Sequence, residues 1–211
     1  MTMNHAFDAV IFDFSGVMVA SAFHAMAQVA PDHPREDVLD LLMGPYHEDT
    51  DHHWHQVERG EISIFDWVVW VQEEAERRDI PIDLSRMQTM MGDLVPQEPM
   101  LAICRRIREA GMKTSLLTNN VAEGSSSWRV VLPLDDLFDD VVDSSEVGMR
   151  KPNPDIFHLA LERLGGIAPD RAVFLDDAPG NIEGAHSAGL HTILVDDTTV
   201  AAQQLEALVL N

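Results

Sequence analysis

The sequence is poor in cysteine and in basic residues, and each shortage excludes a class of protein. Cys104 is the only cysteine among the 211 residues, so the chain cannot form an internal disulfide. We therefore expect a reducing, cytoplasmic environment, in which disulfides are rare. Fourteen basic residues stand against 36 acidic ones, which gives a formal charge of −22. Because nucleic-acid phosphates bind to basic surface, we expect no nucleic-acid partner.

Long apolar runs are also missing. No stretch approaches the roughly 20 apolar residues that cross a bilayer, so we expect no membrane partner. Residues 1–8 do not combine a basic region with an apolar core, as a secretion signal would. Lysine occurs only at Lys113 and Lys151. A lysine at position 151, in a chain that otherwise uses arginine, marks a candidate functional position.

The hydrophobic pattern alternates between strands and helices. Short apolar runs bounded by turn residues predict strands at 8–13, 113–118, 140–142, 172–175 and 192–195. Apolar residues at helical spacing predict helices at 35–43, 64–75, 85–92, 99–110, 154–164, 181–188 and 200–210, and an amphipathic stretch at 128–132. This alternation is typical of an α/β protein with a doubly wound, parallel, Rossmann-like sheet.

The stretch between the first two strands contains no convincing strand and has the pattern of helices. A chain of 211 residues suits one domain that carries a sizeable insertion. We therefore predict a Rossmann-like core formed by residues 1–18 and 96–211, and an inserted helical domain formed by residues 19–95.

Polar side chains follow four of the predicted strands, where the strands end or just beyond. They are Asp13, the pair Thr118 and Asn119, Lys151, and the pair Asp176 and Asp177. The carboxyl ends of parallel strands share one edge of a sheet, so these groups can converge there. Each of them alone is more often a cap or a turn residue, but their coincidence in this order is specific.

Their chemistry suits phosphoryl transfer. Three carboxylates in one place repel one another unless a hard cation holds them, and Mg²⁺ prefers such oxygen ligands. Thr118 and Asn119 can donate hydrogen bonds to a phosphate, and Lys151 supplies a positive charge. Asp13 beside Mg²⁺ can attack phosphorus and form an aspartyl-phosphate.

These motifs resemble those of the haloacid dehalogenase superfamily over nearly the whole chain. The four matching stretches are 12–17 (FDFSGV), 117–119 (LTN), 148–152 (GMRKP) and 174–185 (FLDDAPGNIEGA). With residues 58–63 (ERGEIS), they are most similar to the branch of bacterial glucose-1-phosphate phosphatases. The amino-terminal phosphatase domain of mammalian epoxide hydrolase is a more distant likeness. The resemblance implies that residues 19–95 are a helical cap domain.

The resemblance also implies roles for individual residues. Asp13 would be the nucleophile and a Mg²⁺ ligand, and the backbone carbonyl of Ser15 a second ligand. Asp177 would be the third, while Asp176 would bind the metal or a metal-bound water and pair with Lys151. Thr118, Asn119 and Lys151 would bind the phosphoryl group, and Asn181 would brace the fourth motif.

Ser15 departs from the family pattern. Most phosphatases of the family have a second aspartate there, which protonates the leaving oxygen and then activates the hydrolytic water. Such proton transfer contributes about 10²–10⁴ in rate, and a serine hydroxyl cannot supply it. The metal site is unaffected, because any residue offers the backbone carbonyl. We therefore expect slow turnover, or an acid from elsewhere in the chain.

Histidines in the insertion are candidates for that acid. His24 stands alone, and a cluster that could form a substrate-facing loop comprises Tyr46, His47, His52, His53, Trp54 and His55. Histidine titrates near neutral pH, and we name His47 first, as a substrate-binding residue that also replaces the lost acid. Two other interpretations are solvated helix residues and a zinc site. Trp67 and Trp70 are expected to pack the insertion, whereas Trp54 is the tryptophan expected to touch substrate.

We thus predict a Mg²⁺-dependent phosphatase that hydrolyses a small phosphorylated metabolite through an aspartyl-phosphate on Asp13. A sugar phosphate is one candidate substrate. Three alternatives are a carbon–halogen hydrolase, a phosphotransferase, and a catalytically impaired relative that binds a phosphorylated ligand. Monomer and homodimer are both left open.

Overall fold

The structure, a computed structural model, describes residues 6–21, 26–86 and 94–210. Its sheet has five parallel strands in the order β3-β2-β1-β4-β5. The strands are β1 (Ala9–Phe12), β2 (Lys113–Thr118), β3 (Asp140–Asp143), β4 (Ala172–Asp176) and β5 (His191–Leu194). The predicted α/β fold with a doubly wound parallel sheet is confirmed. Asp176 was expected just after its strand and is instead the last residue of β4.

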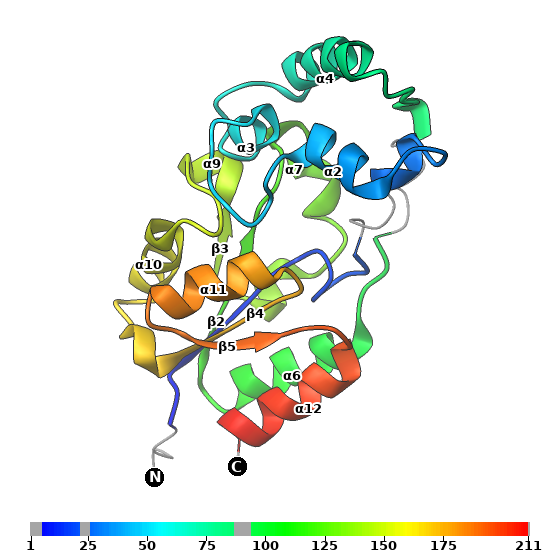
Figure 1. The fold of residues 1–211 in the computed structure, drawn as a ribbon. Coiled ribbons are helices and arrows are strands. Elements are labelled where there is room, and N and C mark those ends of the chain that lie inside the picture. The colour runs from blue at the N-terminus through cyan, green and yellow to red at the C-terminus, as the bar shows by residue number, and fades with distance from the viewer. Residues whose placement is uncertain (1–5, 22–25, 87–93, 211) are drawn as a thin grey trace.

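Helices cover both faces of the sheet (Figure 1). On one face lie α6 (Glu98–Glu109) and α12 (Thr198–Val209), and on the other α10 (Pro154–Arg163) and α11 (Pro179–Ser187). Side chains alternate along β1: Val10 and Phe12 belong to the first apolar core, whereas Ala9 and Ile11 belong to the second. All four are fully buried, which explains why β1 is an unbroken apolar run.

Short helices occupy several connections. They are η2 (Ala122–Gly124), α7 (Ser125–Trp128), α8 (Leu134–Leu137), α9 (Ser144–Val147) and η3 (Pro169–Arg171). The amphipathic stretch expected at 128–132 is helical only at Trp128, because α7 ends there. Pro133 lies just before α8, which the sequence pattern did not predict because four residues are too short to display a helical period.

The described part of residues 19–95 consists of helices joined by loops. The helices are η1 (Ala27–Val29), α2 (Arg35–Met43), α3 (His53–Glu58) and α4 (Ile64–Arg78). A capping box begins α4, since Ser63 and Asp66 accept hydrogen bonds from each other's backbone N–H groups at 3.1 Å. Helix α3 was not predicted. The helix expected at 85–92 falls mostly outside the described residues, as does His24.

This insertion has its own apolar cluster, which includes Leu41, Leu42, Trp67 and Val71. The two chain segments that connect it to the sheet lie side by side. The Ala20 N–H donates to the Val95 carbonyl, and the Gln97 N–H donates to the Met18 carbonyl, both at 2.9 Å. The boundaries predicted at residues 18/19 and 95/96 stay predictions.

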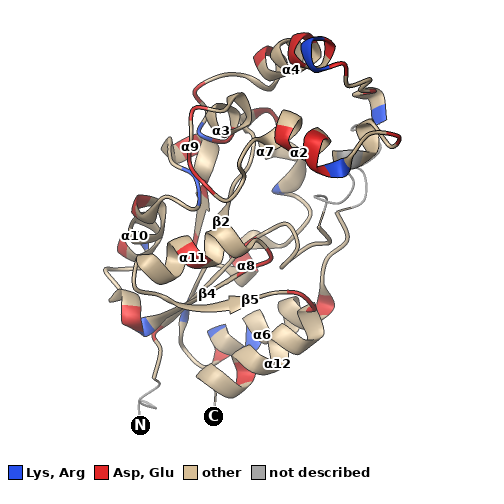
Figure 2. Ribbon diagram, in the orientation of Figure 1, with Lys and Arg blue, Asp and Glu red and all other residues tan. Residues whose placement is uncertain are grey.

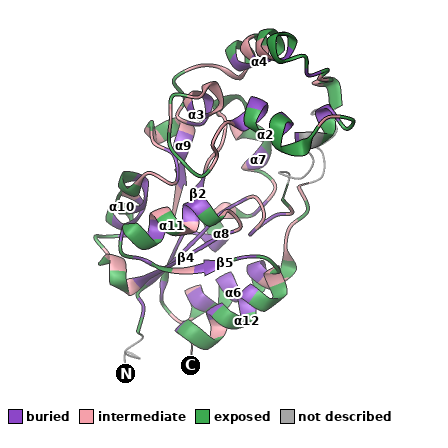
Figure 3. Ribbon diagram, in the orientation of Figure 1, coloured by how far each residue is buried: buried purple, intermediate pink, exposed green. Residues whose placement is uncertain are grey.

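Acidic residues are spread over helices in both parts of the molecule and do not gather in one place (Figure 2). Burial is concentrated in the strands and on the helix faces that meet them (Figure 3). No helix in the described part of the chain is long and apolar enough to cross a membrane.

Candidate active site

Asp13 lies directly after β1, at the carboxyl edge of the sheet. Its N–H donates to the Leu175 carbonyl at 2.9 Å, which continues the pairing with β4 by one residue. The chain then turns away through Gly16, whose φ is +88°. A Cβ on Gly16 would lie 2.0 Å from Asp177 Oδ2. Glycine is therefore required at position 16 for two reasons: the left-handed backbone conformation and the close approach of the Asp177 carboxylate.

Lys151 joins two of the aspartates. Its ammonium donates to Asp13 Oδ1 and to Asp176 Oδ2, both at 2.6 Å, and to the Leu117 carbonyl at 3.0 Å. Only 1% of Lys151 is exposed. Burial works to lower the Lys151 pKa, but the two aspartates outweigh it and raise this pKa above its usual value. The ammonium therefore stays charged near neutral pH.

Reciprocal hydrogen bonds hold the Lys151 loop against the end of β2. The Lys151 N–H donates to Asn119 Oδ1 at 2.8 Å, and Asn119 Nδ2 donates to the Lys151 carbonyl at 3.0 Å. Thr118, the last residue of β2, is buried at the cavity floor. These bonds fix the Lys151 backbone, because Asn119 directly follows the last residue of β2.

Asp176 is held from three sides. Asn181 Nδ2 donates to its two oxygens at 3.1 and 3.0 Å, the Ala178 N–H donates to Oδ1 at 2.8 Å, and Lys151 donates to Oδ2. Asn181 thus braces the loop between β4 and α11. Asp177 points into the cavity, and burial followed by repulsion from Asp176 raises its pKa to about 6.

The three aspartates suit a divalent cation. Asp13, Asp176 and Asp177 each offer a carboxylate oxygen, and these oxygens lie within 4.8 Å of one another. When all are ionised, three negative charges share one ammonium. Burial accordingly raises the Asp13 pKa well above its usual value, although Lys151 opposes the shift. A hard cation with oxygen ligands would cancel the excess charge, so the donor set fits Mg²⁺.

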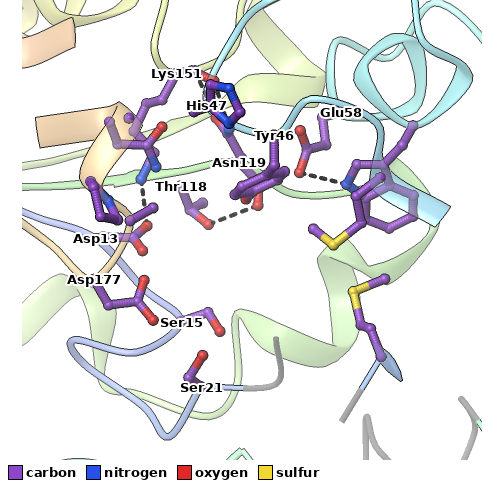
Figure 4. Close-up of a pocket in the computed structure, with 17 residues that line it drawn as sticks. Asp13, Ser15, Ser21, Tyr46, His47, Glu58, Thr118, Asn119, Lys151 and Asp177 are labelled. Atoms are coloured by element: carbon purple, nitrogen blue, oxygen red, sulfur yellow. Dashed lines mark hydrogen bonds and ion pairs between the residues drawn. The ribbon is translucent and has the colours of Figure 1, made fainter. Parts of the chain in front are cut away.

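A cavity of about 440 Å³ opens above these groups. Its floor comes from the sheet edge and includes Asp13, Ser15, Thr118, Asn119, Lys151 and Asp177 (Figure 4). Its opposite wall comes from the insertion and is formed by Met26, Met43, Tyr46, His47, Trp54 and Glu58. All the predicted core site residues except Asp176 line the cavity, and Asp176 lies behind Lys151.

His47 is the histidine of the cluster that lines the cavity. Its backbone packs on the start of α11, where a Cβ on Gly180 would lie 2.6 Å from the His47 Cα. The expectation of a substrate-facing loop is wrong for His52, His53 and His55. They begin or belong to α3, and His53 stacks on Trp70 with ring centroids 4.3 Å apart.

His52 and His55 are kept neutral by their surroundings. Burial lowers the His52 pKa to about 4 and the His55 pKa to about 3. Thr50 N–H donates to His55 Nδ1 at 3.1 Å, a bond that requires this nitrogen to be unprotonated. In the described part of the chain, the aspartates of the floor form the one group suited to a metal, so these histidines do not build a zinc site.

A buried ion pair ties the Lys151 loop to the insertion. Arg150 Nε donates to Glu58 Oε2 at 2.7 Å, with side-chain exposures of 0% and 3%. Glu58 Oε1 accepts from Trp54 Nε1 at 2.9 Å, and Arg150 NH1 donates to the Glu48 carbonyl. Burial still raises the Glu58 pKa above its usual value.

Several cavity residues were not predicted. Glu58 was noted only within the stretch 58–63 and was given no role in the site. Met43 was expected at the end of the helix predicted at 35–43, and Met26 lay outside every predicted element. Tyr46, by contrast, belonged to the cluster predicted to face the substrate. It belongs to the cavity wall, with the Arg150 guanidinium 5.3 Å from its ring centroid.

The fold and the site suit a hydrolase, and comparison with known proteins gives the family. The chain belongs to the haloacid dehalogenase-like hydrolases, whose family model matches residues 7–189. The resemblance inferred from the motifs is thus confirmed.

Known proteins with similar sequences are of several kinds. The chain is 33% identical to acyl-CoA dehydrogenase family member 10 of Mus musculus, over 96% of this chain and 19% of that protein. It is 30% identical to bifunctional epoxide hydrolase 2 of Mus musculus, over 92% of this chain and 37% of that protein. It therefore spans about a fifth and just over a third of these relatives. It is 26% identical to sesquiterpene phosphatase astK of Aspergillus oryzae, over 96% and 97%.

Solved structures share the fold. A haloacid dehalogenase family enzyme of Bacteroides thetaiotaomicron, in complex with magnesium and inorganic phosphate, superposes with a TM-score of 0.62. It is 20% identical and covers 90% of this chain and 96% of that one.

Proposed function

We propose that the protein is a Mg²⁺-dependent phosphatase that hydrolyses a small phosphate monoester through an aspartyl-phosphate on Asp13. The observation that carries this proposal is the Lys151 ammonium, 2.6 Å from both Asp13 and Asp176, beside the third carboxylate Asp177. A site with excess negative charge and one fixed ammonium suits an anionic substrate that arrives with a divalent metal.

Each floor residue has a proposed role. Asp13 attacks phosphorus, and Lys151 favours the ionised form of its carboxylate and stabilises charge on the phosphoryl oxygens. Thr118 and Asn119 donate hydrogen bonds to the phosphoryl group. Asp13, Asp177 and the Ser15 carbonyl are the proposed metal ligands, and Asp176 holds Lys151 while contacting the metal or its water. Bound Mg²⁺ would neutralise charge that builds up on the transferring group.

His47 is the proposed general base for the second step, in place of the aspartate that is missing at position 15. Among the described histidines it is the one at the cavity, and a neutral imidazole can take a proton from the water that hydrolyses the aspartyl-phosphate. Ser15 cannot do so. His47→Ala should slow this second step and change the pH–rate profile. An unchanged profile and rate would remove His47 from the mechanism.

Ser15 also favours a second candidate, a phosphotransferase. If water is activated poorly, the aspartyl-phosphate lasts longer and another acceptor can take the phosphoryl group. Residues 19–95 are proposed to be a cap domain that presents the wall of the cavity to the substrate. A cytoplasmic location and the absence of nucleic-acid and membrane partners stay predictions from composition.

The test is phosphate release from a panel of esters, measured with Mg²⁺ and with EDTA. Release should require the metal and disappear in Asp13→Asn. Asp143→Asn is a matched control, because Asp143 is also a fully buried aspartate at a strand end but lies outside the cavity. It caps α9, and asparagine caps equally well. No release from any ester by the folded protein would refute the proposal.

A further inference from the structure

The two halves of the cavity differ in chemistry. The floor is polar, whereas the wall supplied by the insertion contains Met26, Met43, Tyr46 and Trp54. Figure 4 shows the two sulfur-containing side chains across the cavity from Asp13. Met43 is 3% exposed and ends α2. Burial raises the Tyr46 pKa well above its usual value, so its phenol stays neutral. Aromatic and thioether side chains favour contact with a flat apolar group.

The cavity also offers little to a second anion. Among the described residues that line it, Lys151 is the single lysine or arginine, and two aspartates already engage it. Arg150 is fully buried, paired with Glu58 and absent from the lining. Glu58 itself adds negative charge to the wall. Substrates whose leaving group carries a carboxylate or a second phosphate are therefore disfavoured, and so are 2-haloacids.

Ser15 limits the leaving group in a different way. In the first step the leaving oxygen must depart with the electron pair of the bond to phosphorus. Without a carboxylic acid at position 15 that oxygen leaves unprotonated, which is far easier for a phenol than for an aliphatic alcohol. A phenol has a pKa of about 10. Water, which is about as acidic as a simple alcohol, has a pKa of about 16.

We propose that this cavity takes the monophosphate of an uncharged, apolar phenol: an aryl phosphate. This inference rests on the phosphatase function proposed above. An Asp13 oxygen forms a bond to phosphorus, the bond from phosphorus to the aryl oxygen breaks, and the phenolate leaves and takes a proton from solvent. Water then cleaves the aspartyl-phosphate, which releases phosphate and restores Asp13. The apolar wall selects the ring, and the missing acid selects its weakly basic oxygen.

Phenyl phosphate and cyclohexyl phosphate provide the test, because they share ring size and apolarity but differ in leaving-group basicity. The quantity compared is kcat/KM, since it excludes the hydrolysis of the aspartyl-phosphate that both substrates share. We expect phenyl phosphate to be favoured by about 10² or more, the range that a general acid would otherwise supply. Ser15→Asp should restore the acid and raise kcat/KM for cyclohexyl phosphate. The ratio of the kcat/KM values for phenyl and cyclohexyl phosphate should therefore fall.

The possible failures can be told apart. Similar kcat/KM for the two esters in the wild type would overturn the inference while leaving the phosphatase function intact, and would mean that a residue such as His47 protonates the leaving oxygen. Faster hydrolysis of glucose 1-phosphate than of phenyl phosphate would overturn it as well. No release even from 4-nitrophenyl phosphate, whose leaving group needs no acid, would refute the function and the inference together.

A variant pair tests the wall without touching the floor. Met43→Gln places a polar group in the apolar half, and Met43→Leu keeps its character. Met43→Gln should lower kcat/KM for phenyl phosphate several-fold relative to Met43→Leu, and it should lower kcat/KM for the small substrate acetyl phosphate by a smaller factor. Thermal unfolding checks that both are folded. Equal values for phenyl phosphate would contradict a role for this wall in binding the ring.

Discussion

Removing either member of the buried pair of Arg150 and Glu58 should destabilise this protein strongly. The two side chains are 0% and 3% exposed and are joined by a 2.7 Å bond. They connect the loop that carries Lys151 to α3 of the insertion. Arg150→Met would leave the Glu58 carboxylate buried with only Trp54 as a hydrogen-bond partner.

Removing one member of a buried pair leaves an uncompensated charge, which destabilises a protein by about 3–5 kcal/mol. Glu58→Gln should have a comparable effect, because the Arg150 guanidinium would then be buried without its carboxylate. The double variant should lose less than the sum of the two single losses, by about 1–3 kcal/mol, since neither charge is left alone. Tryptophan fluorescence during urea unfolding measures all four proteins.

With an m-value of roughly 2 kcal/mol per molar urea, the single variants should unfold at a midpoint lower by about 1.5–2.5 M. Arg106→Met is the control. Arg106 pairs with Glu206 at 2.7 Å, but the side chains are 51% and 39% exposed. An exposed pair contributes about 0.2–1 kcal/mol, so this variant should barely shift the midpoint.

Two results would refute this reasoning. One is an unfolding midpoint of Arg150→Met equal to that of the Arg106→Met control, which would mean that water or a rearranged neighbour compensates the Glu58 charge. The other is a double variant that loses the full sum of the two single losses in stability, which would mean that the residues act independently. In either case the ion pair would not be what holds the Lys151 loop to the insertion.

Three further outcomes are expected. Protonation of His55, whose pKa burial lowers to about 3, opposes folding. The stability contributed by neutral His55 is complete above its unfolded-state pKa of about 6.5. It is lost as the pH falls from there towards the folded-state pKa, by up to about 1.4 kcal/mol per pH unit. His55→Asn should flatten that loss in urea unfolding between pH 6.5 and 4. Gly180→Ala should displace His47 and raise KM, whereas Gly124→Ala, whose Cβ would meet only a side-chain carbon at 3.3 Å, should not. Cys104, buried with its pKa raised to about 12 by burial, should resist a thiol reagent until the protein unfolds.

The sequence predicted the sheet well because its strands are buried on both faces. All five strands were expected, and β2 begins and ends where predicted, at Lys113 and Thr118. Helices with explicit start signals were also found, as with Ser63 for α4 and Pro154 for α10. Helix α3 was missed because its six residues (HWHQVE) include only two apolar side chains, Trp54 and Val57, which is too few to display a helical period.

The floor of the site was predictable for the same reason. Asp13, Thr118 and Asp177 adjoin strand ends, and parallel strands bring their ends together whatever the loops do. The wall was predicted only in part: Tyr46, His47 and Trp54 were expected to face the substrate, and they line the cavity. Met26, Met43 and Glu58 were not expected there, because they meet through packing between elements whose relative placement leaves no mark in the sequence. Histidine density near residue 50 was therefore a poor guide: it combined His47, which lines the cavity, with neighbours that pack α3.

Ser15 and the apolar wall are explained by one kind of substrate. An aspartate at position 15 would add a fourth carboxylate to a floor where three already share one ammonium. Burial and repulsion would raise its pKa, which is what a general acid for an alkoxide leaving group requires. A phenolate needs no such acid, and an apolar wall binds its ring. In the step that expels the leaving group, loss of the aspartate therefore costs little rate with an aryl phosphate and a great deal with an alkyl one.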